Sequence, residues 1–271
     1  MFLQVDKCPI CLAGFPEVIW DYQRPDQYEL LAGITSDPKR EWLRCVSCGF
    51  HFTSRNYPVA ELRKCYTNGY RNQEFRGGTM RQNFDTIMQI PYAESENAQR
   101  EKWLMRQIYQ IPGSMLDIGS GLGVFPAAMS RMGVDVTCVE PNKDSADFIK
   151  NDLKLECLNQ FYDGPVDGEF DLVTLVHVLE HEEAPIRMLT AVRENLKEDG
   201  WLFIEVPDAE EFRYLPKEHD EFNSCHVVFY DMASLFHVMV NAGFLVHIMA
   251  SVRTKVRDLS RIMLLAKKYG K

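Results

Sequence analysis

The chain has 271 residues, 46% of them hydrophobic and 25% charged, which is enough to bury the core of one large domain or of a domain with an appendage. It has no run of about 18 uncharged apolar residues, and polar residues interrupt positions 1–10, where a secretory signal needs an apolar segment; we therefore expect a cytoplasmic protein without a membrane span. The net charge of -9 disfavours a nucleic-acid partner, although positions 39–81 carry nine basic residues against three acidic ones.

The first expected unit, residues 1–57, contains two Cys-x-x-Cys pairs, Cys8 with Cys11 and Cys45 with Cys48. Each pair forms a tight turn that offers two thiolates to one tetrahedral ion, and without an export signal metal ligation is favoured over disulfides. We predict a zinc-ribbon-like module held by structural Zn2+, with free thiols or redox chemistry as alternatives. His51 is near enough in sequence to enter the shell, but four cysteines already complete it.

The second expected unit, residues 58–112, is polar and biased toward helix, with a helix expected at 98–110. We interpret it as a helical linker that also covers the next domain. Tyr66 and Tyr70 are candidates for a lid over a bound cofactor, and ordinary packing is the alternative for tyrosines in such a cover.

From residue 113 to residue 271, short β-rich runs alternate with amphipathic helices, which is typical of a mainly parallel sheet covered on both faces. The expected strands are 115–118, 134–139, 155–158, 172–176, 201–206, 244–249 and 261–266. The expected helices are 124–132, 143–152, 184–196 and 231–241, the last with Asp231 as its N-cap and Gly243 just past its end. The pattern predicts an α/β, Rossmann-like domain.

A glycine-rich turn follows the first of these strands, where Gly119, Gly121 and Gly123 lead into a helix. Glycine permits positive φ and lets a ligand approach the backbone closely. Glu140 lies about 20 residues further on, at the end of the second strand, where a carboxylate can accept hydrogen bonds from both hydroxyls of a ribose. A dinucleotide is the rival ligand, but its fingerprint requires a third glycine one position later, where Val124 stands.

Several ordered motifs resemble those of the class I S-adenosylmethionine-dependent methyltransferases. Residues 116–123 resemble the first motif of that family and residues 139–142 the second; residues 170–173 with 177–181 resemble the fourth, and residues 196–202 resemble the turn into its fifth strand. The resemblance implies a seven-stranded sheet whose last strand is antiparallel, with S-adenosylmethionine across the carboxyl ends of the strands.

The same resemblance assigns residues to the cofactor. Asp117 and Gly119 would approach its amino-acid part, and Glu140 its ribose, with Gly121 and Pro141 in the adjoining turns. Phe161 would lie near adenine, with ordinary core packing as the alternative. His177 would pack beneath the cofactor or take part in catalysis, and Tyr70 would belong to the lid.

The segment after the fifth strand, residues 218–230, is polar and contains histidines, and it resembles the segment that lines the acceptor pocket in sugar methyltransferases. Transfer of a methyl group to a hydroxyl needs a base for the hydroxyl proton, and imidazole has a suitable pKa. His226 is the first candidate and His181 the second.

A cysteine module before such a domain resembles sugar and surface-polysaccharide methyltransferases more than ribosomal RNA guanine methyltransferases. It implies a saccharide or nucleotide-sugar acceptor and a role in carbohydrate biosynthesis. The alternatives are C-methylation of a keto-sugar, RNA methylation, and a non-catalytic cofactor-binding or scaffold protein; the sequence does not predict the oligomeric state.

Overall fold

The computed structural model describes residues 7–14, 16–34, 40–55, 59–68, 77–254 and 258–269. Within these residues, no helix is long and apolar enough to cross a membrane.

A seven-stranded sheet forms the centre of the larger domain. Its strands, in spatial order, are β10 (Phe244–Arg253), β11 (Ser260–Lys268), β8 (Leu196–Pro207), β7 (Phe170–Val176), β4 (Ser114–Ile118), β5 (Asp135–Val139) and β6 (Glu156–Leu158). The pairs from β8 to β6 are parallel, whereas β11 runs antiparallel to both of its neighbours. This arrangement confirms the predicted Rossmann-like sheet with an antiparallel last strand.

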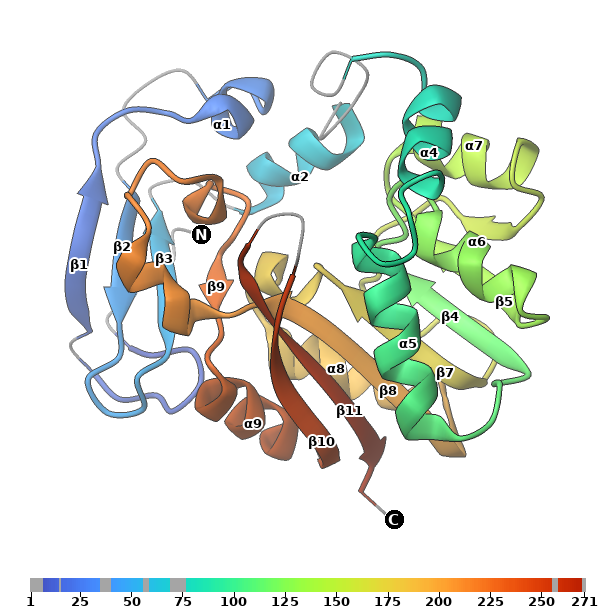
Figure 1. Ribbon diagram of the computed structural model, residues 1–271. Coiled ribbons are helices and arrows are strands. Elements are labelled where there is room, and N and C mark those ends of the chain that lie inside the picture. The colour runs from blue at the N-terminus through green and yellow to red at the C-terminus, as the bar shows by residue number, and fades with distance from the viewer. Residues whose placement is uncertain are drawn as a thin grey trace.

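Helices cover both faces of this sheet, as Figure 1 shows. One face packs against α5 (Glu96–Ile108), α6 (Val124–Arg131) and α7 (Lys143–Asn151), and the other against α8 (Pro185–Glu194) and α9 (Met232–Asn241). The alternation of strand side chains explains this, because in β4 Met115 enters the first core and Leu116 the second. Helix α4 (Met80–Met88) packs outside α6 and α7, with Phe84 against Phe148.

Capping residues in the sequence correctly predicted where some helices begin and end. The Asp231 side chain caps α9 as predicted by accepting a hydrogen bond from the Ser234 N–H, and Gly243 follows the helix with φ of +79°. Strand β8, however, begins at Leu196 instead of residue 201, because its first residue pairs with Phe170 across an irregularity in the register.

A second sheet unites the cysteine-bearing segment with the larger domain. Its order is β1 (Glu17–Tyr22), β2 (Arg40–Arg44), β3 (His51–Arg55) and β9 (Val228–Phe229), all antiparallel. In Figure 1 the orange β9 lies beside the blue β3, although it comes from the segment after β8. Trp42 packs against Phe222 and Phe229, so this joint has its own aromatic core.

Short helices complete the connections. They are α1 (Gln27–Leu31) and α2 (Val59–Asn68), and three 3-10 turns, η1 (Leu179–His181), η2 (Ala209–Tyr214) and η3 (Asp220–Phe222). The division into three units at residues 57 and 112 stays a prediction.

Candidate functional site

The glycine turn between β4 and α6 has three glycines in the left-handed region, each in a different environment. At Gly119 an added Cβ would lie 2.6 Å from Val178 Cγ2, and at Gly123 it would lie 2.8 Å from Leu153 Cδ1. At Gly121 it would meet no atom of the described part of the chain within 4 Å, although φ is +55°. Gly119 and Gly123 therefore allow the turn to pack closely against neighbouring side chains. Gly121 leaves open space near the N-terminus of α6, where a ligand can approach the backbone.

Glu140 closes this turn from the end of β5. Its Oε2 accepts a hydrogen bond from the Gly121 N–H at 2.7 Å, and its Oε1 accepts one from the Asn142 N–H at 2.8 Å. Burial raises the pKa of Glu140 to about 7, against these two hydrogen bonds, which lower it. Each oxygen keeps a second lone pair, so the carboxylate can hold the turn and still accept from ligand hydroxyls. Pro141, half-buried beside it, accepts through its carbonyl from Asn159 Nδ2.

Asp117 lies inside the sheet, with 3% of its surface exposed. Its Oδ1 accepts a hydrogen bond from Thr174 Oγ1 of β7 at 2.5 Å, and burial raises its pKa to about 6. Ser120 of the turn also interacts with this carboxylate and lowers its pKa, and the Ser120 hydroxyl donates a hydrogen bond to the Asp117 carbonyl.

A buried charged network runs beneath the end of β7. Arg100 of α5 binds the Glu205 carboxylate with two hydrogen bonds, of 2.7 and 2.6 Å. Burial opposes the ionisation of Glu205, but the Arg100 charge and the hydrogen bond from His177 hold its pKa well below the usual range.

His177 connects this network to η1. Its Nδ1 lies 3.1 Å from Glu180 Oε1 and its Nε2 lies 3.2 Å from Glu205 Oε1. Burial lowers the pKa of His177, but the two carboxylates outweigh it and raise that pKa overall. Because ionised carboxylates only accept hydrogen bonds, both ring nitrogens donate. The residue also has φ of +55°, a strained conformation for a side chain with a Cβ.

The structure brings the two candidate bases together. The rings of His181 and His226 have centroids 4.9 Å apart, although one ends η1 and the other precedes β9. His226 Nδ1 lies 2.7 Å from the Glu221 carbonyl, and His181 Nδ1 lies 2.8 Å from the Cys225 carbonyl. Since a carbonyl only accepts, Nδ1 carries the proton in each ring, and Nε2 of the neutral imidazole is the basic nitrogen.

Helix α2 spans the expected donor and acceptor sides. Tyr66 places its hydroxyl 3.1 Å from His181 Nδ1, and its carbonyl accepts from Asn142 Nδ2 at 3.1 Å. Phe161 is half-buried and packs against this helix, with the Arg63 guanidinium 4.7 Å from its ring centroid. Tyr70 lies outside the described residues.

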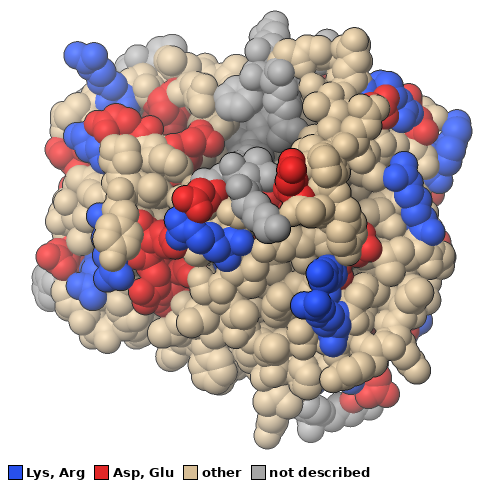
Figure 2. Space-filling view, in the orientation of Figure 1, with Lys and Arg blue, Asp and Glu red and all other residues tan. Residues whose placement is uncertain are grey.

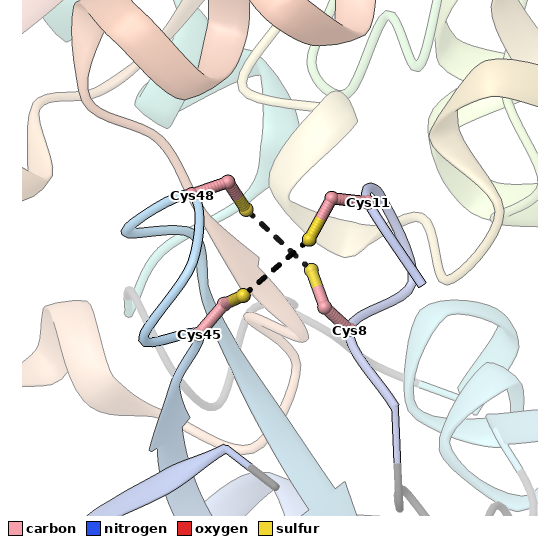
Figure 3. Close-up of side chains that lie close together, drawn as sticks. All are labelled: Cys8, Cys11, Cys45 and Cys48. Carbon is pink, nitrogen blue, oxygen red and sulfur yellow. Dashed lines mark hydrogen bonds between the residues drawn. The ribbon is translucent and has the colours of Figure 1, made fainter. Parts of the chain in front are cut away.

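The four paired cysteines converge, as Figure 3 shows. The Sγ atoms of Cys8 and Cys48 are 3.7 Å apart, and those of Cys11 and Cys45 are 3.5 Å apart. Four sulfurs around Zn2+ at about 2.3 Å stand about 3.8 Å from one another, so the donor set fits a tetrahedral ion. His51 is not among the residues of this cluster; its ring packs against Trp42.

Sequence reasoning missed the residues that support these side chains. Glu180 was visible only as part of a family motif, and nothing local indicates that Arg100 reaches Glu205 across the fold. A charged residue in an otherwise apolar run, such as Glu205 within residues 201–206 of β8, was the one available signal, because such a residue needs a buried partner.

Comparisons with known proteins agree with this geometry. A family model described as a methyltransferase domain matches residues 82–247, more than half of the chain. The mitochondrial ubiquinone biosynthesis O-methyltransferase of Schizosaccharomyces pombe is 34% identical over 99 residues, which cover 33% of this chain and 36% of that protein. The matched part is thus about a third of that relative's length.

Two solved structures share the fold at low identity. The 1,6-didemethyltoxoflavin-N1-methyltransferase of Burkholderia thailandensis aligns with a TM-score of 0.55 and 15% identity, covering 87% of this chain and all of that one. A glycopeptide N-methyltransferase aligns with a TM-score of 0.52 and 16% identity, covering 64% of this chain and 90% of that one. With the family model matching most of the sheet and the whole glycine turn, the chain belongs to the methyltransferase-domain family.

Proposed function

We propose that this protein transfers the methyl group of S-adenosylmethionine to a hydroxyl of a small-molecule acceptor. The observation that carries the proposal is that the paired rings of His181 and His226 lie at the end of a short turn, η1, whose start adjoins the glycine turn. Val178, the neighbour of Gly119, directly precedes η1, which ends at His181. Donor and acceptor residues therefore share one end of the sheet.

The donor side suits a nucleoside with an amino-acid tail. Gly121 leaves the backbone accessible, and the Glu140 carboxylate has lone pairs left for the two ribose hydroxyls. We propose that Asp117 orders the turn that meets the amino-acid part, and that Pro141 and Phe161 border the ribose and adenine. His177 would support this end of β7 from below, through its contacts with Glu180 and Glu205.

Bound S-adenosylmethionine would supply an electrophilic methyl group, whose transfer to oxygen breaks its bond to sulfur and leaves sulfur with the electron pair. The task of this chain is to position the acceptor oxygen and to make its proton easy to lose. The basic Nε2 of His226 or of His181 could help to remove the hydroxyl proton in two ways. It could accept the proton itself, or it could bind a cation that acidifies the hydroxyl.

The acceptor class is a proposal guided by the relatives. The saccharide acceptor expected from the sequence finds no support in the curated relative described above, which is named for O-methylation in ubiquinone biosynthesis. We therefore propose oxygen as the methylated atom and a small organic hydroxyl compound as the acceptor, in place of a carbohydrate.

RNA methylation is not favoured. Five basic residues of positions 39–81 lie within ion-pair distance of acidic side chains: Arg40, Arg44, Arg63, Lys64 and Arg81. On the face shown in Figure 2, the described basic residues are scattered among acidic ones and form no continuous stripe. The described basic residues on this face therefore offer little to a phosphate backbone.

The donor half is tested by calorimetry with S-adenosylmethionine. The wild type should bind it and Gly121→Arg should not, while Gly133→Arg, at another open positive-φ glycine, should bind normally. No binding by the wild type would exclude the enzyme proposal and would leave a non-catalytic scaffold as the better interpretation.

The acceptor half is tested by a labelled-methyl assay on a panel of phenols, quinone precursors, nucleotide sugars, oligosaccharides and RNA. His226→Ala should reduce turnover at least about 100-fold, the usual contribution of general acid-base catalysis. Turnover of a saccharide and not of the other compounds would contradict the proposed acceptor class.

We further propose that Cys8, Cys11, Cys45 and Cys48 bind one structural Zn2+. Their small module borders the main core, and a metal supplies the folding energy that a unit of this size lacks. Elemental analysis should give about one zinc per chain, lost on Cys45→Ser and kept on Ser47→Ala in the same turn.

A further inference from the structure

We propose that Glu180, His181 and His226 bind a divalent transition-metal cation on the acceptor side of the site. This inference deepens the proposed methyl transfer and rests on it for the role of the cation. It concerns a set of nitrogen and oxygen donors that is separate from the four cysteines.

The three side chains are close enough to share one ion. One ligand atom from each lies within 4.8 Å of the other two. Neighbouring donors in one coordination shell stand about 3.0–3.4 Å apart, so the side chains would rotate toward one another to close on a cation. Two imidazoles and one carboxylate on one side of an ion leave positions open for other ligands, as first-row transition metals accommodate.

The two histidines are held as metal ligands usually are. A ligating imidazole almost always donates its second N–H to a carbonyl or carboxylate, which fixes the ring and directs the other nitrogen to the metal. His226 donates through Nδ1 to the Glu221 carbonyl and His181 through Nδ1 to the Cys225 carbonyl. In both neutral rings the lone pair is therefore on Nε2.

Glu180 supplies an independent observation. It is 1% exposed, its Oε1 faces His177 Nδ1, and its Oε2 is buried without a hydrogen-bond partner among the described residues. An unpartnered carboxylate oxygen in the interior is costly, and a cation is one of the few groups that compensate for it. The contact with His177 fixes the carboxylate in the way outer-shell hydrogen bonds orient metal ligands.

The location gives the cation a function. Glu180 and His181 belong to η1, the turn that follows Val178 at Gly119, so an oxygen bound to the cation would lie on the donor side of the domain. A cation lowers the pKa of a bound hydroxyl, and it favours acceptors with two adjacent oxygens that can chelate it. In this form the two imidazoles act as ligands and not as bases. The cation would acidify the bound hydroxyl, which would release its proton to solvent water as the oxygen takes the methyl group.

Binding of Co2+ to the metal-depleted full-length protein tests the inference. Cobalt on the cysteines gives thiolate-to-metal charge-transfer bands, whereas cobalt on Glu180 and the two histidines gives only ligand-field bands. Equilibrium dialysis of the wild type should therefore show bound Co2+ beyond the ion that produces charge transfer.

Glu180→Gln and His226→Ala should each weaken this second ion at least about tenfold, an effect seen even for outer-shell residues, and should leave the charge-transfer bands intact. His237→Ala, on the exposed surface of α9, is the matched control and should keep the ion. Absence of the second ion from the wild type, or equal affinity in the Glu180→Gln and His226→Ala variants, would overturn the inference.

Calorimetry with S-adenosylmethionine on the same samples separates the two proposals. If the protein binds S-adenosylmethionine normally but binds no second Co2+, the proposal of methyl transfer is kept and the proposal of a cation site is contradicted. If the protein binds a second Co2+ but not S-adenosylmethionine, the proposal of methyl transfer is contradicted and the proposal of a cation site is kept.

Discussion

Replacement of Gly121 by alanine is the sharpest test of the donor site. At φ of +55° an alanine is strained, and the left-handed conformation costs a residue with a Cβ about 1–2 kcal/mol. The new Cβ meets no atom of the described residues within 4 Å, so no further loss of stability is expected from them. It does, however, occupy the open space that we assign to the donor, so the affinity for S-adenosylmethionine should fall at least tenfold, or about 1.4 kcal/mol.

Gly133→Ala is the matched control, because Gly133 also has positive φ and open space, but lies beyond the far end of α6. Urea unfolding should show a similar loss of stability for both variants, and calorimetry should show impaired binding only for Gly121→Ala. Gly119→Ala should be less stable than either, since its Cβ would lie 2.6 Å from Val178. Equal donor affinity in the Gly121 and Gly133 variants would refute the assignment of this space.

Three further predictions follow from buried groups. Arg100→Met leaves the Glu205 carboxylate buried without its guanidinium, so urea unfolding should show a loss of about 3–5 kcal/mol; a loss below about 1 kcal/mol would contradict the ion pair's role. The pKa of Glu140 is raised to about 7, so its carboxyl is protonated below that pH and donor affinity should fall from about pH 8 to about pH 6, a trend that Glu140→Gln should abolish in calorimetry. Cys45→Ser should lower the melting temperature along with the zinc content, and an unchanged melting curve would remove the structural role.

The sequence by itself determined the features whose causes are local. The strands of the seven-stranded sheet and the helices α6 to α9 were predictable, because side-chain alternation, caps such as Asp231 and a glycine turn act over a few residues. The cysteine pairs indicated their own convergence in the same way, since each turn presents two sulfurs.

Only the tertiary structure decided which distant residues meet. Arg100 reaches Glu205 over a separation of 105 residues, and His181 and Cys225 are 44 residues apart when they join. The pairing of β9 with β3 was also decided by the tertiary structure. A two-residue edge strand is too short to have a recognisable sequence pattern. Buried polar groups acquire their partners through packing between elements, so the environment of Glu180, His181 and His226 exists only in the folded chain.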